Sequence, residues 1–201
     1  TEAGLGYMVR AIEGAGYSTE EIGISLDVAS TELYKDGAYH MDGKALTGEE
    51  LSDIYATWVD EYPLLSIEDG FAEDDWRSWS HCMRDIGDKV QLVGDDLFVT
   101  QSERLSMGID SKAANAILVK VNQVGTITET LETMDLASAH GFNSVVSHRS
   151  GETEDTTIAD LAVGTRAGQI NTGAPARSDR VAKYNQLLRI SNEVSEYRSP
   201  F

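Results

Sequence analysis

The chain has 201 residues, of which 41% are hydrophobic and 25% charged, and its formal net charge is −18. These proportions are ordinary for a globular domain, whereas the acidic charge argues against binding nucleic acid or an anionic membrane surface, which needs a basic face. The single cysteine, Cys82, excludes an intramolecular disulfide and suits a reducing cytoplasm. The sequence has no run of about 18 apolar residues, so it predicts no membrane span.

Short β-type runs alternate with helical patterns along the chain. The strands are predicted at 22–30, 64–70, 90–96, 116–122, 142–148 and 167–173. Apolar residues spaced by three and four predict helices around 51–59, 127–134 and 158–163, and a further helix opens at Ser102 with Thr100 as its candidate cap. Strands alternating with helices of this length predict a parallel α/β protein.

The predicted strands share a second regularity, because each ends in a polar residue. From the second strand on, these residues recur at intervals of 23 to 28, roughly one strand plus one helix. They are Asp27, Glu68, Asp95, Lys120, His148 and Asn171. A polar group at the carboxyl end of each successive strand is typical of a TIM-type (β/α) barrel, where the strand ends surround one mouth. An open doubly wound sheet is the alternative, but the Gly-rich phosphate loops GxGxxG and GxxxxGK[ST] are absent from the sequence.

The expected barrel is incomplete. Six strands are predicted, whereas a closed barrel has eight and uses about 250 residues. The chain also begins in a helical pattern, TEAGLGYMVRAIEG, with Leu5, Met8, Val9 and Ile12 on one face. We therefore expect about two barrel strands to lie upstream of residue 1.

Three carboxylates, Asp27, Glu68 and Asp95, come from the ends of three consecutive strands. Like charges that converge repel each other unless a cation joins them, and hard oxygen ligands favour Mg²⁺. The alternative is that each acid only caps the helix that follows it.

Lys120 lies at the end of the next strand, where an unpaired ammonium group buried in an apolar run would be costly. A nearby divalent cation and partial desolvation both disfavour its charged form, which makes it a candidate general base. A structural salt bridge to one of the acids is the alternative.

The segment SHRSGET at 147–153 predicts an anion site. Arg149 can grip a phosphate or carboxylate through a bidentate fork. Ser150 and Gly151 offer backbone N–H groups shortly before a helix expected to begin around residue 155 or 156, and His148 lies at the same rim. The alternative is that Arg149 is a solvated loop residue.

Several longer segments resemble the enolase family, in family order and over almost the whole chain. They are SLDVAS, SIEDGFAEDDW, LVGDDLFVT, ILVKVNQVG, SHRSGETEDTTIADLAVG and GQINTGAPARSDRVAKYNQLLRI. The resemblance implies that residues 1–201 are part of an enolase C-terminal barrel domain. It also implies a cytoplasmic enzyme, a homodimer when full length, that dehydrates 2-phosphoglycerate to phosphoenolpyruvate.

The resemblance also implies residue roles. The three carboxylates match the magnesium ligands, and Lys120 matches the base that removes the C2 proton. Arg149 and Ser150 match contacts to the substrate phosphate, with His148 beside them. The glutamate that acts as general acid and a mobile serine loop belong to the upstream part of the family's chain, so this chain is expected to be inactive alone.

One departure from the family concerns Asn171, which stands where the family has a lysine that touches the substrate carboxylate. Loss of an electrostatic donor at an active site costs on the order of 3 kcal/mol. This departure motivates a non-catalytic alternative, a degenerate enolase-like chain kept for binding or structure. A rival enzymatic reading is a Schiff-base aldolase with Lys120 as its nucleophile.

Overall fold

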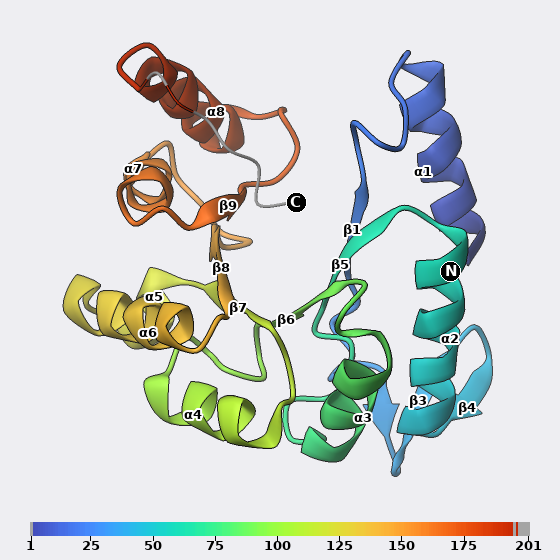
Figure 1. The fold of residues 1–201 in the computed structure, drawn as a ribbon. Coiled ribbons are helices and arrows are strands. Elements are labelled where there is room, and N and C mark those ends of the chain that lie inside the picture. The colour runs from blue at the N-terminus through green and yellow to red at the C-terminus, as the bar shows by residue number, and fades with distance from the viewer. Residues whose placement is uncertain (1, 195, 197–201) are drawn as a thin grey trace. The chain divides into compact units, whose positions relative to one another are not determined.

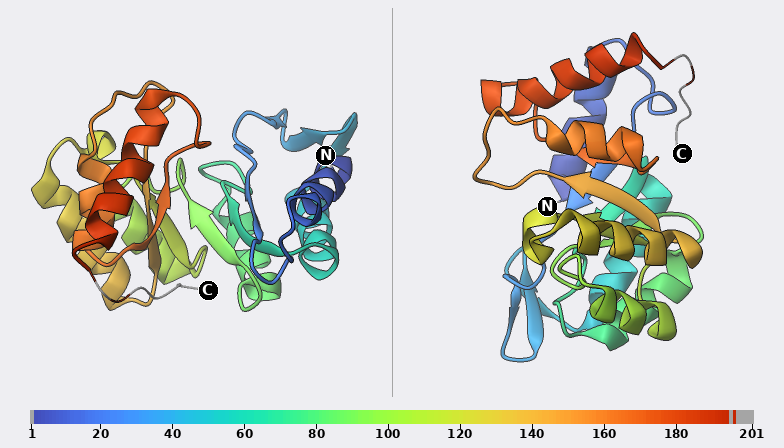
Figure 2. Two further views of the ribbon diagram at one scale, coloured as in Figure 1. Left: turned by 90° about the horizontal axis from the view of Figure 1, so that it is seen from above. Right: turned by 90° about the vertical axis from the view of Figure 1, so that its left-hand side faces the viewer.

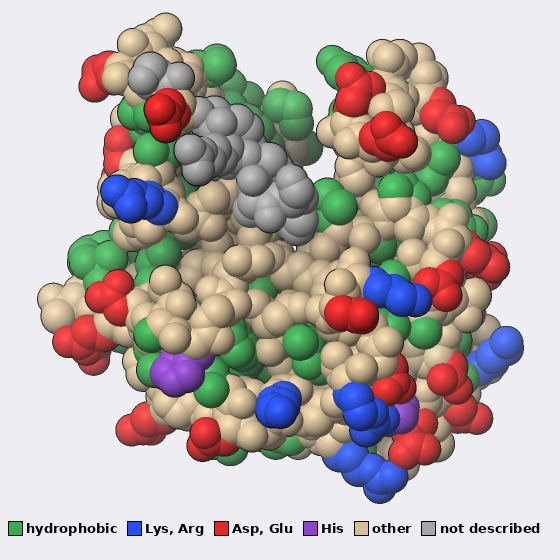
Figure 3. All heavy atoms as spheres, in the orientation of Figure 1, with side chains coloured by type: hydrophobic (Ala, Val, Ile, Leu, Met, Phe, Trp, Pro, Cys, Tyr) green, Lys and Arg blue, Asp and Glu red, His purple; other side chains and the backbone are tan. Residues whose placement is uncertain are grey.

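The computed structural model describes residues 2–194 and 196. The chain divides into two compact units. Unit 1 comprises Thr1–Phe98 and Glu103–Asn115, and unit 2 comprises Val99–Ser102 and Ala116–Phe201. Asp and Glu side chains are spread over the face drawn in Figure 3, as the net charge of −18 leads one to expect.

Unit 1 is built on three parallel strands, β1 (Ile24–Asp27), β5 (Leu64–Glu68) and β6 (Gln91–Gly94), in that spatial order (Figure 1). The helices of this unit are α1 (Glu2–Gly14), α2 (Gly48–Glu61), α3 (Trp76–Ile86) and, from its second residue on, α4 (Ser102–Ser111). All residues of β6 are buried, as are all of β5 except its second residue, which is the pattern of a parallel strand covered on both faces.

A small antiparallel sheet in unit 1 has no counterpart in the sequence prediction. Its strands are β2 (Tyr34–Lys35), β3 (Ala38–Met41) and β4 (Lys44–Leu46). These strands are too short to show a clear alternation of apolar and polar residues. The available signal was the pair of Asp-Gly turns at 36–37 and 42–43, where both residues of each turn have positive φ, the form that joins two-residue hairpins.

An aromatic cluster forms the core of unit 1 next to the segment that follows β5. Tyr39, Tyr55, Phe71 and Trp79 are each at most 1% exposed, and their neighbouring rings pack edge to face with centroids 5.6 to 5.9 Å apart. Their polar atoms reach the same segment, since the Tyr55 hydroxyl donates to the Gly70 carbonyl at 2.8 Å and the Trp79 indole donates to the Ala72 carbonyl at 3.2 Å. The cluster therefore holds the backbone just after the end of β5.

Unit 2 repeats the same plan with β7 (Ala116–Val119), β8 (Asn143–Ser147) and β9 (Gly168–Asn171), which are parallel in that order. Its helices are α5 (Val121–Val124), α6 (Ile127–Ala139), α7 (Thr157–Gly164) and α8 (Ser178–Ser191). Figures 1 and 2 show α7 and α8 lying side by side. Parallel strands with intervening helices in both units confirm the expected parallel α/β class.

Some boundaries differ from the prediction. The strand predicted at 116–122 ends at Val119, and Val121 and Asn122 belong to α5 instead. On α1, Leu5 and Ile12 are buried as expected, but Met8 is 52% exposed. Within the part of the chain that the structure describes, no helix is both long enough and apolar enough to cross a membrane.

Candidate functional site

All six polar residues predicted at strand ends lie at strand ends in the structure. Three are the last residues of their strands, Asp27, Glu68 and Asn171, and three follow their strands directly, Asp95, Lys120 and His148. Within unit 1, Asp27 pairs in register with Glu68. Within unit 2, Ser147 at the end of β8 pairs with Asn171. Each unit therefore presents its polar residues along the carboxyl edge of its own three strands.

Three carboxylates of unit 1 lie close together after the ends of β5 and β6. Glu68 and Asp95 are each 9% exposed, whereas Asp27 is exposed. Among the described residues, one carboxylate oxygen each from Asp69, Asp95 and Asp96 lies within 4.8 Å of the other two. This group contains one predicted magnesium ligand, Asp95, and two residues that the sequence analysis did not select.

Asp69 connects the ends of β5 and β6. Its carboxylate accepts hydrogen bonds from the backbone N–H groups of Asp95 and Asp96, both at 2.8 Å. Burial raises the pKa of Asp69 to about 7, with the two N–H donors lowering it and the neighbouring carboxylates raising it further. Its φ of 44° lies in the left-handed region, which short Asp side chains tolerate better than most. The Asp directly after the strand-terminal Glu68 was the signal that could have identified it.

The donor set of this group fits a magnesium ion. Three carboxylates supply hard oxygen ligands, and each oxygen of Asp69 that accepts an N–H bond keeps a second lone pair. Asp69 also fixes the backbone of the two acids that follow β6. Among the described residues this group thus places the predicted ligand Asp95 beside two further carboxylates, Asp69 and Asp96, whereas Asp27 and Glu68 do not belong to it.

Lys120 is half-buried and occupies the N-cap position of α5. Its backbone N–H donates to the Thr100 hydroxyl at 2.9 Å. Thr100 was expected to cap α4, but that helix begins at Ser102 and the Thr100 hydroxyl bonds to residues beyond β7 instead. The prediction that Thr100 caps α4 was therefore wrong. Its hydroxyl bonds to residues about 20 positions further along the chain, which a local sequence pattern does not reveal.

Two basic residues of α8 hold the loop that follows β8. Arg180, 8% exposed, donates to the ring of His148, to the carbonyl of Arg149 at 2.9 Å and to the carbonyl of Ser150 at 3.0 Å. Lys183, 1% exposed, donates to the carbonyl of Thr153 at 2.5 Å. The sequence analysis missed both residues, although their spacing of three placed them on one helical face.

His148 is partly buried among these cations. Burial lowers its pKa, and the charges of Arg180, Lys120 and Lys183 add to this, while Glu152 opposes it. Because the Arg180 guanidinium can only donate, Nδ1 of His148 accepts and the neutral ring carries its proton on Nε2. His148 is thus a neutral donor at this position.

The predicted anion residues Arg149 and Ser150 are exposed. Arg149 donates from Nη1 to Oδ1 of Asn122 at 2.6 Å, which directs its guanidinium toward α5. The helix α7 begins only at Thr157, whose N–H is already capped by Asp155 at 2.9 Å. This start lies within two residues of the expected one, and the contribution of the helix to an anion site at Ser150 and Gly151 stays a prediction.

Asn171 is half-buried at the end of β9. Its backbone carbonyl accepts from the N–H of His148 at 2.9 Å, so the two residues lie next to each other along the sheet edge. Its carboxamide brings no charge to this position.

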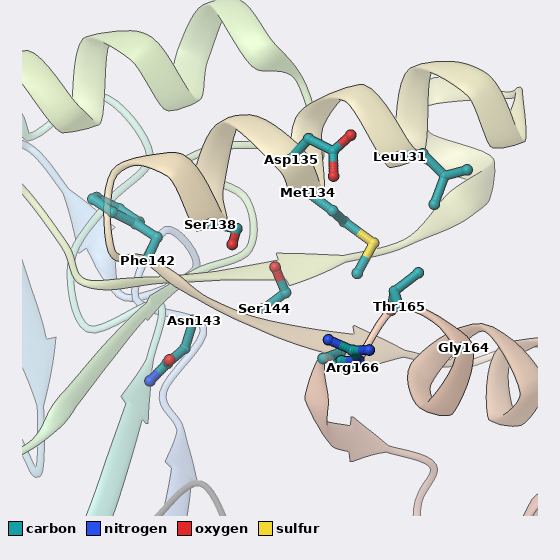
Figure 4. Close-up of a pocket in the computed structure, with 11 residues that line it drawn as sticks. Leu131, Met134, Asp135, Ser138, Phe142, Asn143, Ser144, Gly164, Thr165 and Arg166 are labelled. Carbon is teal, nitrogen blue, oxygen red and sulfur yellow. The ribbon is translucent and has the colours of Figure 1, made fainter.

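A cavity of about 450 Å³ in unit 2 is separate from these residues. Figure 4 shows Met134 and Asp135 of α6 and Arg166 after α7 around it. It also includes Asn143 and Ser144, which begin β8, whereas His148 follows the other end of that strand. Enzymes of the (β/α) barrel class place their chemistry at the carboxyl ends of the strands, so this cavity is not the candidate site.

Comparison with family models gives a match over nearly the whole chain. The matching family is described as enolase, C-terminal TIM barrel domain, and the match covers residues 1–199.

Proposed function

The chain belongs to the enolase C-terminal TIM barrel family, and from this premise we propose that it carries the metal-binding and proton-abstracting part of an enolase. Its six parallel strands are part of an incomplete (β/α) barrel, as the sequence predicted. The proposed reaction is the Mg²⁺-dependent dehydration of 2-phosphoglycerate to phosphoenolpyruvate and water. We further propose that residues 1–201 form part of one domain of a cytoplasmic homodimer.

The observation that supports the proposal best is the convergence of Asp69, Asp95 and Asp96 at the end of β6. The next strand in the chain, β7, is followed directly by Lys120. Removal of a proton beside a carboxylate requires a base and a metal ion that offsets the charge. Here a group of acids that can bind a metal and a lysine amine follow consecutive strands of the chain. We propose Asp27, Glu68 and Asp95 as magnesium ligands, with Asp69 and Asp96 supporting Asp95.

In the proposed reaction, the chain's own residues have separate roles. Lys120, in its deprotonated form, accepts the proton from C2 of the substrate, and the electron pair left behind spreads onto the adjacent carboxylate. His148, Arg149 and Ser150 bind the phosphate, while Arg180 holds that loop by its carbonyl groups. Bound magnesium offsets the negative charge that builds on the substrate carboxylate. Hydroxide leaves C3 as water after protonation by the glutamate that the resemblance places upstream.

Two measurements on this chain test the proposal. Titration calorimetry should detect Mg²⁺ binding that is lost in Asp95→Asn and kept in Glu13→Gln, a matched change at an exposed acid of α1. In D₂O with Mg²⁺, NMR should detect slow exchange of the C2 proton of 2-phosphoglycerate, since this step needs only the base. Exchange that persists in Lys120→Met would show that another group removes the proton.

The non-catalytic alternative rests on Asn171. Mg²⁺ binding without C2 exchange, in a chain joined to its upstream part, would favour that alternative. The aldolase alternative predicts that borohydride traps a carbonyl substrate on Lys120, and an absence of trapping together with Mg²⁺-dependent exchange would exclude it.

A further inference from the structure

Two consecutive β-branched residues between β6 and α4 adopt a backbone conformation that such residues rarely take. Val99 has a φ of 43° and Thr100 a φ of 57°. For β-branched side chains the left-handed region is sterically strained. Strain of this kind persists only where surrounding contacts compensate for it, and it gathers at functional sites.

Thr100, which is fully buried, makes contacts that can compensate for this strain. Its hydroxyl accepts from the backbone N–H of Lys120 at 2.9 Å and donates to Oε1 of Gln123 at 2.7 Å. Its carbonyl accepts from the hydroxyl of Thr133 at 3.2 Å. The left-handed turn therefore directs the Thr100 hydroxyl to the residue that follows β7.

Lys120 and Gln123 stand at the two ends of one short turn. Lys120 is the N-cap of α5, and its own side chain makes no cap hydrogen bond to this helix. Gln123 is its third residue, and Gly125, with a φ of 103°, ends it. A single hydroxyl thus binds the start of the turn through an N–H group and its far end through a carboxamide. This fixes the backbone from which the Lys120 side chain extends.

We propose that the Thr100 hydroxyl and the Gln123 carboxamide form a clamp that positions the Lys120 amine for proton abstraction. The proposal rests on the proposed function of Lys120 as the base, and Thr100 acts as a positioning residue. Reacting atoms must be held to within a fraction of an ångström, so a displaced backbone at the base lowers the rate even when the amine is intact.

The test compares Thr100→Val, which removes the hydroxyl, with Thr100→Ser, which keeps it. Thr130→Val is the matched control, since Thr130 is also fully buried but donates only to the carbonyl of Thr126 at 2.8 Å. The first readout is amide hydrogen exchange at Lys120. The second is the acetylation rate of its amine by mass spectrometry, relative to the exposed Lys35 and Lys112.

In Thr100→Val, we expect exchange at the Lys120 amide to become about tenfold faster, because this part-buried N–H loses its acceptor. Acetylation of its amine should approach the rate of the exposed lysines. Thr100→Ser should restore both values, and Thr130→Val should change neither. If Thr100→Val does not fold, Gln123→Met removes the bond from the Thr100 hydroxyl to the carboxamide and leaves the Lys120 N–H its acceptor. In this variant acetylation of the Lys120 amine should become faster, whereas exchange at its amide should change less than in Thr100→Val.

Unchanged exchange and unchanged acetylation in Thr100→Val, or unchanged acetylation in Gln123→Met, would overturn the clamp. Because neither readout depends on turnover, a clamp that passes this test while C2 exchange is absent would leave the positioning intact and reject the proposed function instead.

Discussion

At the end of β9, an uncharged side chain occupies a position where the enolase resemblance implies a lysine. Asn171 lies beside His148 on the sheet edge, through the bond from the His148 N–H to its carbonyl. By the enolase resemblance, a lysine here would add a cation near the substrate carboxylate, whereas the carboxamide offers hydrogen bonds without a charge. The residue at 171 therefore determines how strongly the proposed site attracts its anionic substrate.

We predict that Asn171→Lys increases turnover of 2-phosphoglycerate in a chain joined to its upstream part. The restored charge should contribute on the order of 3 kcal/mol, roughly a hundredfold in rate. The measurement is phosphoenolpyruvate formation at saturating substrate, with Asn171→Gln as the uncharged control. Equal rates for the three chains would show that charge at this position does not limit the reaction.

The pKa of His148 is lowered in the folded state by burial and by the charge of Arg180. Below its ordinary pKa of about 6.5, the unfolded chain binds a proton that the folded chain takes up less readily. The stabilising contribution of the neutral ring is therefore fully present above that value and is lost as the pH falls toward the lowered pKa.

Urea unfolding from about pH 8 to about pH 5 tests this sign. The wild-type chain should lose more unfolding free energy over this range than His148→Gln, which has no titrating ring. Comparison of the two chains removes the contributions of other groups. A smaller loss in the wild type would mean that the folded state favours the protonated ring.

Among the elements, α8 has the clearest structural task, because Arg180 and Lys183 anchor the loop after β8. Their donors reach four backbone carbonyl groups, since Lys183 also bonds to the carbonyl of Asp179 at 2.8 Å. A buried cation that loses its partners strongly destabilises the fold, and so do buried carbonyl groups that lose their donor. The loop that carries Arg149 and Ser150 is thus held by a helix about 30 residues further along the chain.

We predict that Arg180→Leu lowers the free energy of unfolding by on the order of 2 kcal/mol or more and loosens this loop. Trypsin should then cut after the exposed Arg149 several times faster than in the wild type. Arg189→Leu is the control, because Arg189 is exposed near the end of the same helix and donates only to Gln186, at 3.1 Å. Equal cutting rates in both variants would show that α8 does not restrain the loop.

For the molecule as a whole, the net charge of −18 acts against compactness. Like charges repel each other more in the folded chain than in the expanded one, and salt screens this repulsion. Part of the stability should therefore depend on ionic strength rather than on any single contact.

We predict that raising tetramethylammonium chloride from about 10 to about 200 mM, which shortens the Debye length from about 30 to below 10 Å, increases the unfolding temperature. Each kcal/mol gained corresponds to about 2–4 °C for a chain of this size. The large organic cation separates screening from binding at the carboxylates, and MgCl₂ at equal ionic strength should add a further rise that Asp95→Asn loses. An unchanged or lower unfolding temperature in the organic salt would contradict the screening argument.

The amino-acid sequence alone predicts the order of the six parallel strands and the polar residue at the end of each, because periodicity and strand termination are local properties. Thus Asp95, Lys120 and His148 were found from the chain alone, and the Asp-Gly turns of the small sheet were readable but overlooked. Which distant groups meet depends on how the strands and helices pack in the folded chain. In the fold, the Asp69 carboxylate accepts from the N–H groups that follow β6. The Thr100 hydroxyl bonds to Lys120 rather than capping α4, and Arg180 donates to His148 and to the loop that follows it. These contacts join residues 20 to 32 positions apart, a separation at which hydrophobic periodicity carries no information and only the packing of strands and helices selects the partner.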